Sequence, residues 1–268
     1  MLSIFVIANA LVPVSATSAG TLGGMVIAGY GPERPLIEKL AHTFEKANPG
    51  SVIDIRWDRN LKAIDMVKAG QAHIAVTGEE DSELTATPIG WDGIAVIVNF
   101  SNPVEEISSQ QVAALFTGKV KSWSELGGAD ARVQLIRRPP NRNLNAGFEK
   151  TLGIAGQIPD SAKVFRSDQK VLSEVGGNLS AVSYLPLGAA LAALQYGMPI
   201  RALIIDRAEA AEPTVKDGRY KLRRPVLLLS GKKANPVAEA FIAFALSKEG
   251  QKIVDEQFIP YGQPDKNP

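Results

Sequence analysis

Short β-branched runs alternate along this chain with stretches whose apolar residues recur at helical spacing. From Met25 onward the pattern predicts a strand at 25–28, a helix at 33–47, a strand at 51–56, a helix at 61–69 and a strand at 72–77. Gly and Pro residues separate these segments, as at Asn48-Pro49-Gly50. Because strands and helices take turns, this order predicts a parallel sheet with helices on its faces.

The most apolar segment is Trp-Asp-Gly-Ile-Ala-Val-Ile-Val-Asn at 91–99. It lacks the polar alternation of a half-exposed strand, so we expect a strand buried on both faces that carries the chain from one lobe to another. After it, the pattern predicts a helix at 108–116, a turn at 123–126, strands at 133–137 and 181–185 with a helix at 146–152 between them, a returning strand within 220–229, and helices at 236–246 and 247–257.

Composition narrows the class of protein without identifying it. The 268 residues carry 29 basic and 28 acidic side chains and are 45% hydrophobic, which is typical of an ordinary globular protein. The length fits one large or two medium α/β domains. The balanced charge lacks the basic excess of a nucleic-acid-binding protein, so we expect no nucleic-acid partner.

Candidate catalytic and metal-binding residues are scarce. The chain has no cysteine, which excludes disulfides and thiolate chemistry, and its two histidines are His42 and His73. His73 lies in an apolar strand, where a structural role is expected. Asp92, Glu79 and Glu80 supply carboxylates, but no set of nucleophile, base and orienting group emerges, so we expect no enzyme, no metal site and no cofactor.

The N-terminal residues 1–19 combine an apolar core with small residues around Ala16 and Ala19. This pattern predicts a secretory signal peptide, although no basic residue precedes the apolar core; a buried N-terminal strand or helix is the alternative. Without a cysteine to carry lipid, the exported form is expected free in the periplasm. No later stretch approaches the roughly 20 apolar residues of a membrane-spanning helix.

Six segments provide a resemblance to a known family. They lie, in order, at 93–99 with 101–103, at 115–118, 123–127, 181–188, 220–225 and 241–251. Together they resemble the phosphate-binding subfamily of periplasmic binding proteins. The resemblance implies an α/β, two-lobed type II fold with two crossover segments and a ligand cleft between the lobes. It implies a first lobe of residues 25–92 plus 200–268 and a second lobe of residues 93–199.

The first two ligand loops that the resemblance implies depart from the family. Gly29, Tyr30, Gly31 and Pro32 stand where family members have Gly-Ser-Gly-Ser/Thr, so Tyr30 offers the one remaining hydroxyl. The alternative is a simple turn between strand and helix. Arg59 precedes the second helix, where it could bind an anion through two hydrogen bonds or lie in solvent as a surface arginine.

The two later loops contain the strongest candidate for anion binding, Arg138, and an acidic pair that would oppose it. Thr77 stands where the family often has serine and aspartate, and the acidic pair Glu79-Glu80 follows it; this pair would repel an anion unless it faces outward. Arg138 matches the family's anion-binding arginine in position. Asn141, Arg142, Asn143 and Leu144 lie in the following loop, and the last three replace Ser-Gly-Thr. A basic surface loop is the alternative interpretation of this segment.

The sequence therefore predicts a monomeric periplasmic solute-binding protein that captures a small anion, phosphate or a related oxyanion or organic anion. The expected partners are that ligand and the permease subunits of an ABC importer. The alternative is a sensor or interaction module that keeps the fold but has lost or changed its ligand. The lost hydroxyls, Tyr30 and the acidic pair Glu79-Glu80 favour this alternative.

Overall fold

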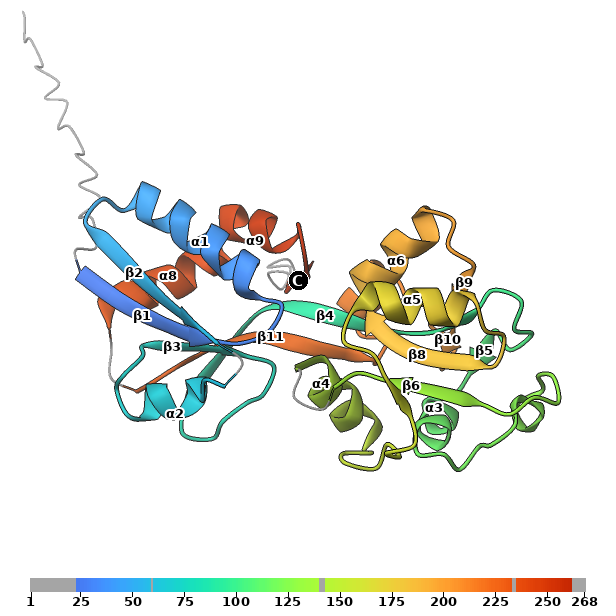
Figure 1. Ribbon diagram of the computed structural model, residues 1–268. Helices are drawn as coiled ribbons and strands as arrows, with labels where there is room; N and C mark the ends of the chain where they lie inside the picture. The colour runs from blue at the N-terminus through green and yellow to red at the C-terminus, as the bar shows by residue number, and fades with distance from the viewer. Residues whose placement is uncertain (1–22, 59, 140–142, 233–234, 262–268) are drawn as a thin grey trace, which may run out of the picture.

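The computed structural model describes residues 23–58, 60–139, 143–232 and 235–261. Figure 1 shows two α/β lobes side by side, joined by the long strands β4 (Thr85–Asn99) and β11 (Arg223–Ser230). Along one continuous path the sheet has the strand order β2-β1-β3-β11-β4-β8-β6-β7, so the two strands that join the lobes lie in its middle. The predicted signal peptide, residues 1–19, lies outside the described residues.

The first lobe is a three-stranded parallel unit covered by helices. Its elements are β1 (Gly23–Gly29), α1 (Arg34–Ala47), β2 (Ser51–Trp57), α2 (Ala63–Lys68), β3 (Ile74–Thr77), α8 (Pro236–Leu246), α9 (Lys248–Val254) and β12 (Ile259–Pro260). β1 pairs in parallel with both β2 and β3, which confirms the predicted parallel sheet. α1 buries Leu36, Ile37, Leu40 and Phe44, and the Phe44 ring meets Phe241 of α8 edge to face.

The second lobe holds the larger hydrophobic core. Its elements are β5 (Glu106–Ile107), α3 (Ser109–Phe116), the 3-10 helix η1 (Trp123–Leu126), β6 (Gln134–Arg137), α4 (Asn143–Leu152), β7 (Lys163–Val164), α5 (Asp168–Gly176), β8 (Ala181–Pro186), α6 (Leu187–Gln195), β9 (Ile200–Ala202), β10 (Ile204–Ile205) and α7 (Glu212–Lys216). α3 begins in a capping box in which Ser108 and Gln111 satisfy each other's backbone N–H groups. Trp123 is buried, and its indole donates to the carbonyl of Ser180 at 3.0 Å.

β4 and β11 carry the chain between the lobes as paired strands. β4 is antiparallel to β11 up to Gly93 and antiparallel to β8 from Ile94 to Val98. The segment from Ile94 to Val98 is fully buried, which confirms the prediction of a strand covered on both faces. The ladder between β4 and β11 shifts register between Val226 and Leu227, close to the junction of the lobes.

The boundary between the lobes follows the packing of residues 200–222. β9 pairs with the end of β4, and Leu203, Val215 and Leu222 are buried in the same hydrophobic cluster as the rest of the second lobe. The division expected from the sequence assigned residues 200–268 to the first lobe. We propose instead that the second lobe extends through Leu222 and that β11 begins the return.

His73 has the structural role expected for it. Its backbone N–H donates to the carbonyl of Val26 at 2.8 Å, and its Nδ1 accepts from the N–H of Val26 at 2.9 Å. The imidazole thus completes the pairing of β1 and β3 before the regular ladder begins at Ile27 and Ile74. No helix among the described segments is long and apolar enough to cross a membrane.

Replacing His73 with Leu should lower the free energy of unfolding by about 1–2 kcal/mol, because the N–H of Val26 loses its acceptor. His73→Asn should cost less than half of that, because an amide oxygen can take the place of Nδ1. Urea unfolding of the two variants checks this. Equal losses would show that the hydrogen bond is not what His73 contributes.

Candidate functional site

Segments from both lobes meet around Arg224, at the start of β11. A methyl group built on Gly78 of the first lobe would lie 3.3 Å from Arg224 Nη1, and one built on Gly147 of the second lobe would lie 2.9 Å from Arg224 Cβ. We call this region the interlobe site and define it by Gly29 to Glu33, Thr77 to Glu79, Asp92, Arg138 and Arg224. In parallel sheets, ligands bind at the carboxyl ends of strands, and β1, β3 and β6 all end in these loops.

The first loop of the interlobe site is held by Trp57. A Cβ on Gly29 would lie 2.4 Å from the Trp57 ring, so position 29 has room for glycine alone. The Trp57 indole donates to the carbonyl of Gly31 at 3.2 Å, and Gly31 has a φ of +103°. Both glycines are therefore explained by the shape of the loop, and a contact with a ligand is not needed to account for them.

The centre of the interlobe site is a buried cluster of three charges. Arg224 Nη1 donates to Glu33 Oε1 at 2.6 Å, and its Nη2 and Nε donate to Asp92 Oδ2 at 2.7 and 3.1 Å. The three side chains are 8% exposed or less. Burial raises the pKa of Asp92 more than the attraction of Arg224 lowers it, and Glu33 adds to the increase.

Gly78 and Gly147 make room for this cluster. The Arg224 side chain passes between them: a Cβ at position 147 would collide with the Arg224 Cβ at 2.9 Å, and one at position 78 would crowd Nη1 at 3.3 Å. Gly147 lies in α4 of the second lobe, and Gly78 follows β3 of the first lobe. Arg224 therefore packs against both lobes while it binds Glu33 at the start of α1 and Asp92 on β4.

Arg138 lies directly after β6, as the sequence predicted, and is 4% exposed. Its Nη2 contacts Asp168 Oδ1 at 2.5 Å and donates to the carbonyl of Arg166 at 3.3 Å. Asp168 also contributes to the raised pKa of Asp92, so the pair of Arg138 and Asp168 is within electrostatic reach of the Arg224 cluster. Arg138 is therefore already paired with a carboxylate within the fold.

The acidic pair Glu79-Glu80 lies at the surface, where both side chains are exposed. Thr77 is buried, and its hydroxyl accepts from the N–H of Glu79 at 3.1 Å, which closes the turn after β3. Tyr30 is half-buried; burial raises its pKa, and the charges of Glu79 and Glu33 raise it further. The Tyr30 hydroxyl therefore stays protonated at neutral pH and keeps a proton to donate.

Three predicted site residues, Arg59, Asn141 and Arg142, lie outside the described residues. Asn143 begins α4, and its backbone alone is described. The sequence interpretation did not place Glu33 or Arg224 in the site, and it considered Asp92 solely as a catalytic candidate. No local signal marks this cluster, because Arg224 lies 191 residues from Glu33 and 132 residues from Asp92 along the chain.

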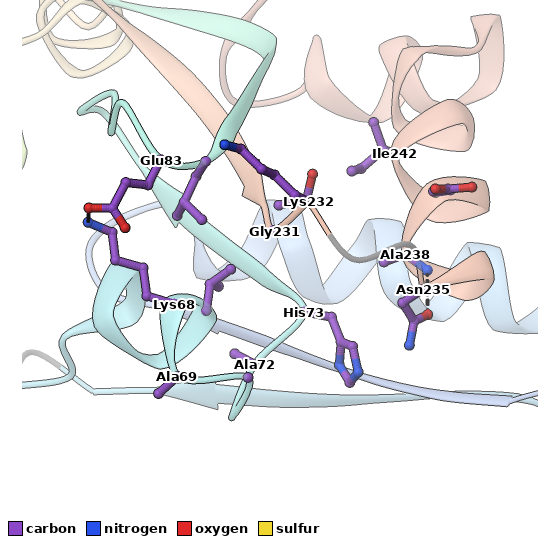
Figure 2. A pocket seen from close by; sticks show the side chains of 15 residues that line it. Lys68, Ala69, Ala72, His73, Glu83, Gly231, Lys232, Asn235, Ala238 and Ile242 are labelled. Carbon is purple, nitrogen blue, oxygen red and sulfur yellow. Dashed lines mark hydrogen bonds and ion pairs between the residues drawn. The ribbon is translucent and has the colours of Figure 1, made fainter.

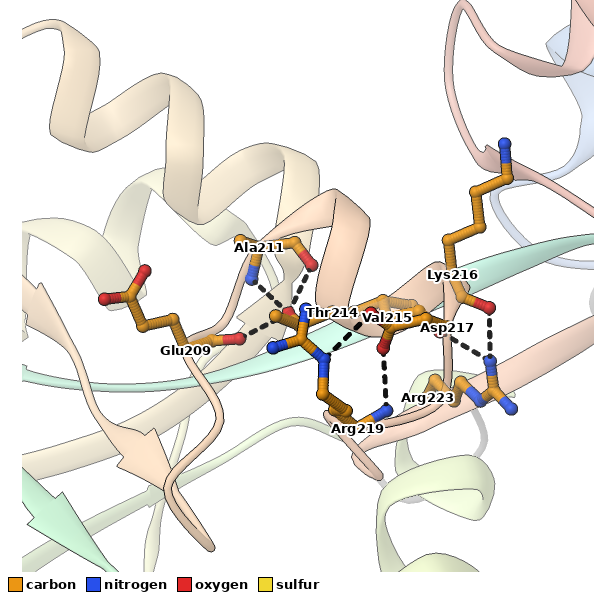
Figure 3. A network of polar contacts seen from close by, with 8 residues as sticks. All are labelled: Glu209, Ala211, Thr214, Val215, Lys216, Asp217, Arg219 and Arg223. Carbon is orange, nitrogen blue, oxygen red and sulfur yellow. Dashed lines mark hydrogen bonds and ion pairs between the residues drawn. The ribbon is translucent and has the colours of Figure 1, made fainter.

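Arg223, the neighbour of Arg224, makes a second set of contacts between the two lobes, outside the charge cluster. Figure 3 shows its guanidinium donating to the carbonyls of Val215 and Lys216 at the end of α7. The same guanidinium lies 3.9 Å from the centre of the Trp91 ring, and that ring stacks on Tyr261. Arg223 therefore connects α7 of the second lobe with the C-terminal segment of the first.

A surface pocket of about 650 Å³ lies elsewhere in the first lobe, and Figure 2 shows its lining. His73 precedes β3 and Lys232 follows β11, so this pocket is at the opposite end of these two strands from Thr77 and Arg224. It is therefore separate from the interlobe site. Across the described ranges, no group of three His, Asp or Glu side chains is arranged to hold a metal ion.

Comparisons with known proteins match nearly the whole chain. A family model described as "PBP superfamily domain" matches residues 14–249. The phosphate-binding protein PstS of Bacillus subtilis (strain 168) is 26% identical over 250 residues, which cover 89% of this chain and 81% of that protein.

Two crystal structures show the same fold. An ABC-type phosphate transport receptor from Vibrio cholerae has a TM-score of 0.78 at 22% identity. The alignment covers 87% of this chain and 98% of the receptor chain. PstS from Borrelia burgdorferi has a TM-score of 0.75 at 18% identity. This alignment covers 89% of this chain and 100% of the PstS chain. These likenesses confirm the predicted two-lobed type II fold and the predicted resemblance to phosphate-binding proteins.

Replacing Arg224 with Met should lower the free energy of unfolding by about 3–5 kcal/mol, because two buried carboxylates lose their partner. Arg219→Met is the matched control, since Arg219 is an exposed arginine paired with Asp217, and its loss should leave stability nearly unchanged. Chemical unfolding of both variants measures the difference. Similar stabilities for the two would contradict a central role for the cluster.

Asp92 should make stability depend on pH. Because its pKa is raised in the folded protein, the folded state binds this proton more tightly than the unfolded state. Its stabilising contribution is complete near and below the ordinary aspartate pKa of about 4 and is lost as the pH rises through the raised value. The unfolding free energy of the wild type minus that of Asp92→Asn should therefore increase from pH 7 to pH 4 in urea titrations; a constant difference would contradict this.

Proposed function

Because the chain belongs to the PBP (periplasmic binding protein) superfamily, we propose that it is a solute-binding protein that captures a small anion for an ABC importer. The proposed ligand is phosphate or a related oxyanion or organic anion. Proteins named for phosphate binding or phosphate transport are among its relatives and structural neighbours, which supports this ligand class. The proposal includes no catalytic step.

The observation that carries the proposal is the position of Arg138. It follows the carboxyl end of β6 and is almost fully buried, and its carbonyl accepts from Asn145 on α4, the helix whose Gly147 packs against Arg224. A buried arginine presents several N–H donors in a fixed plane, which suits an oxyanion. Its pairing with Asp168 does not exclude this role, because one guanidinium can donate to two acceptors at once.

Binding would occur as the two lobes close around the ligand. Closure excludes water from the interlobe site and strengthens each polar contact with the anion. We further propose that the protein acts after export to the periplasm, as a monomer, and delivers its ligand to permease subunits.

A second candidate function is a sensor or interaction module that uses the fold without the original ligand. Arg138 pairs with Asp168, and Arg224 pairs with Glu33 and Asp92, so the two arginines that the structure describes in the site are already neutralised by carboxylates. The hydroxyl residues of the first loop are also replaced, by Tyr30 and Pro32. These features favour a site that has changed its ligand or no longer takes one.

Isothermal titration of the wild type with phosphate, sulfate, molybdate, phosphonates and small carboxylates separates the two candidates. We expect one of these anions to bind, and Arg138→Ala to weaken that binding at least about tenfold, because it removes charged hydrogen bonds worth roughly 1.5–3 kcal/mol each.

Arg137→Ala is the control, because Arg137 is the adjacent arginine but pairs with the fully exposed Asp160. Its affinity should stay close to that of the wild type. No binding across the panel would favour the sensor. Binding that survives Arg138→Ala unchanged would place the ligand elsewhere.

A further inference from the structure

The backbone on both sides of the peptide bond after Arg138 is held by one side chain, Asn145. The Asn145 amide nitrogen donates to the carbonyl of Arg138 at 3.1 Å and to the carbonyl of Pro139 at 2.7 Å. Asn145 lies in the first turn of α4 and is 3% exposed. One amide therefore uses both of its N–H groups on the segment that carries the proposed anion-binding arginine.

The orientation of the Asn145 amide is fixed by Tyr184 on β8. The Tyr184 hydroxyl donates to Asn145 Oδ1 at 2.9 Å, which leaves the amide nitrogen to face the two carbonyls. The Tyr184 ring is fully buried and stacks on Phe148 of α4, with ring centres 4.0 Å apart. Burial also raises the pKa of Tyr184, so its hydroxyl remains a donor.

These contacts give Arg138 two separate anchors. Asp168 and the carbonyl of Arg166 hold the guanidinium from the start of α5, whereas Asn145 holds the backbone from α4. The guanidinium can be directed at a ligand only if the backbone that carries it is fixed as well. A bound anion could compete with Asp168 for the guanidinium, but it could not replace Asn145. The carbonyl oxygens that Asn145 holds need a hydrogen-bond donor, and an anion is an acceptor.

We propose that Asn145, oriented by the Tyr184 hydroxyl, is the positioning residue of the anion site and sets the affinity of Arg138 for its ligand. This inference rests on the proposed function, because it concerns the same arginine. Asn145 does not touch the anion. It acts by fixing the place from which Arg138 binds.

Asn99 provides a matched control in the same lobe. Its amide nitrogen also donates to two backbone carbonyls, those of Val175 and Gly176, at 3.2 and 2.7 Å. Its Oδ1 accepts one hydrogen bond, from the N–H of Ser101 at 2.9 Å, and the residue is 6% exposed. Asn99→Leu therefore removes the same number of hydrogen bonds as Asn145→Leu, two of them to backbone carbonyls in both cases, and none of those of Asn99 is made to Arg138.

The test is calorimetric titration with inorganic phosphate, together with thermal unfolding of each variant. Both Leu variants should lower the melting temperature, but Asn145→Leu should weaken phosphate binding about tenfold, and Asn99→Leu by less than about twofold. In an Arg138→Lys background, Asn145→Leu should add much less than tenfold, because the two residues act as one unit. Should Asn145→Leu not fold, Tyr184→Phe removes the orienting hydroxyl alone and should weaken phosphate binding by a smaller factor.

The outcomes distinguish the positioning role of Asn145 from the proposed anion-binding function. If the wild type binds phosphate and Arg138→Ala abolishes binding while Asn145→Leu leaves it unchanged, the positioning role is wrong and the proposed function stands. Equal losses in the two Leu variants would also overturn it, because they would show a general effect of destabilisation. If neither phosphate nor the other anions bind the wild type, the proposed function is wrong and this inference falls with it.

Discussion

Arg224 brings a guanidinium group into the buried junction between the lobes, and Glu33 and Asp92 bring two carboxylates to meet it. Removing these charges from water is costly, so each can remain buried only while its partners are in place. The start of α1, the middle of β4 and the start of β11 are therefore fixed relative to one another. Gly78 and Gly147 complete the arrangement, since their missing side chains provide the space for the arginine.

This cluster also changes how the interlobe site is understood. An oxyanion site is expected to offer unneutralised positive charge, but here the two described arginines have carboxylate partners within the fold. Two carboxylates around Arg224 give that cluster an excess of negative charge when all three groups are ionised. A ligand of the interlobe site must therefore gain its affinity from well-placed hydrogen bonds more than from net attraction, which makes the placement of Arg138 decisive.

The sequence predicted the fold well where hydrophobic pattern and packing coincide. The run at 91–99 has no polar alternation because both faces of β4 are covered, and the periodic helix at 33–47 differs from α1 by one residue. The pattern did not predict α6, because its residues are apolar on nearly all sides and show no helical stripe. In the site, Arg138 could be found from its place after a strand. Glu33, Arg224 and Asn145 could not, because their roles depend on partners that folding brings from other elements.

The pairing of β4 with β11 across the junction has a mechanical consequence. Two lobes joined by single unpaired segments could swivel freely, whereas a hydrogen-bonded ribbon resists twisting and bends mainly where its ladder is irregular. The register shift between Val226 and Leu227 is such a place, and it lies two residues from Arg224. The irregular point of the ribbon thus adjoins the buried, ion-paired Arg224, so bending of one lobe toward the other would move the charges at the centre of the site.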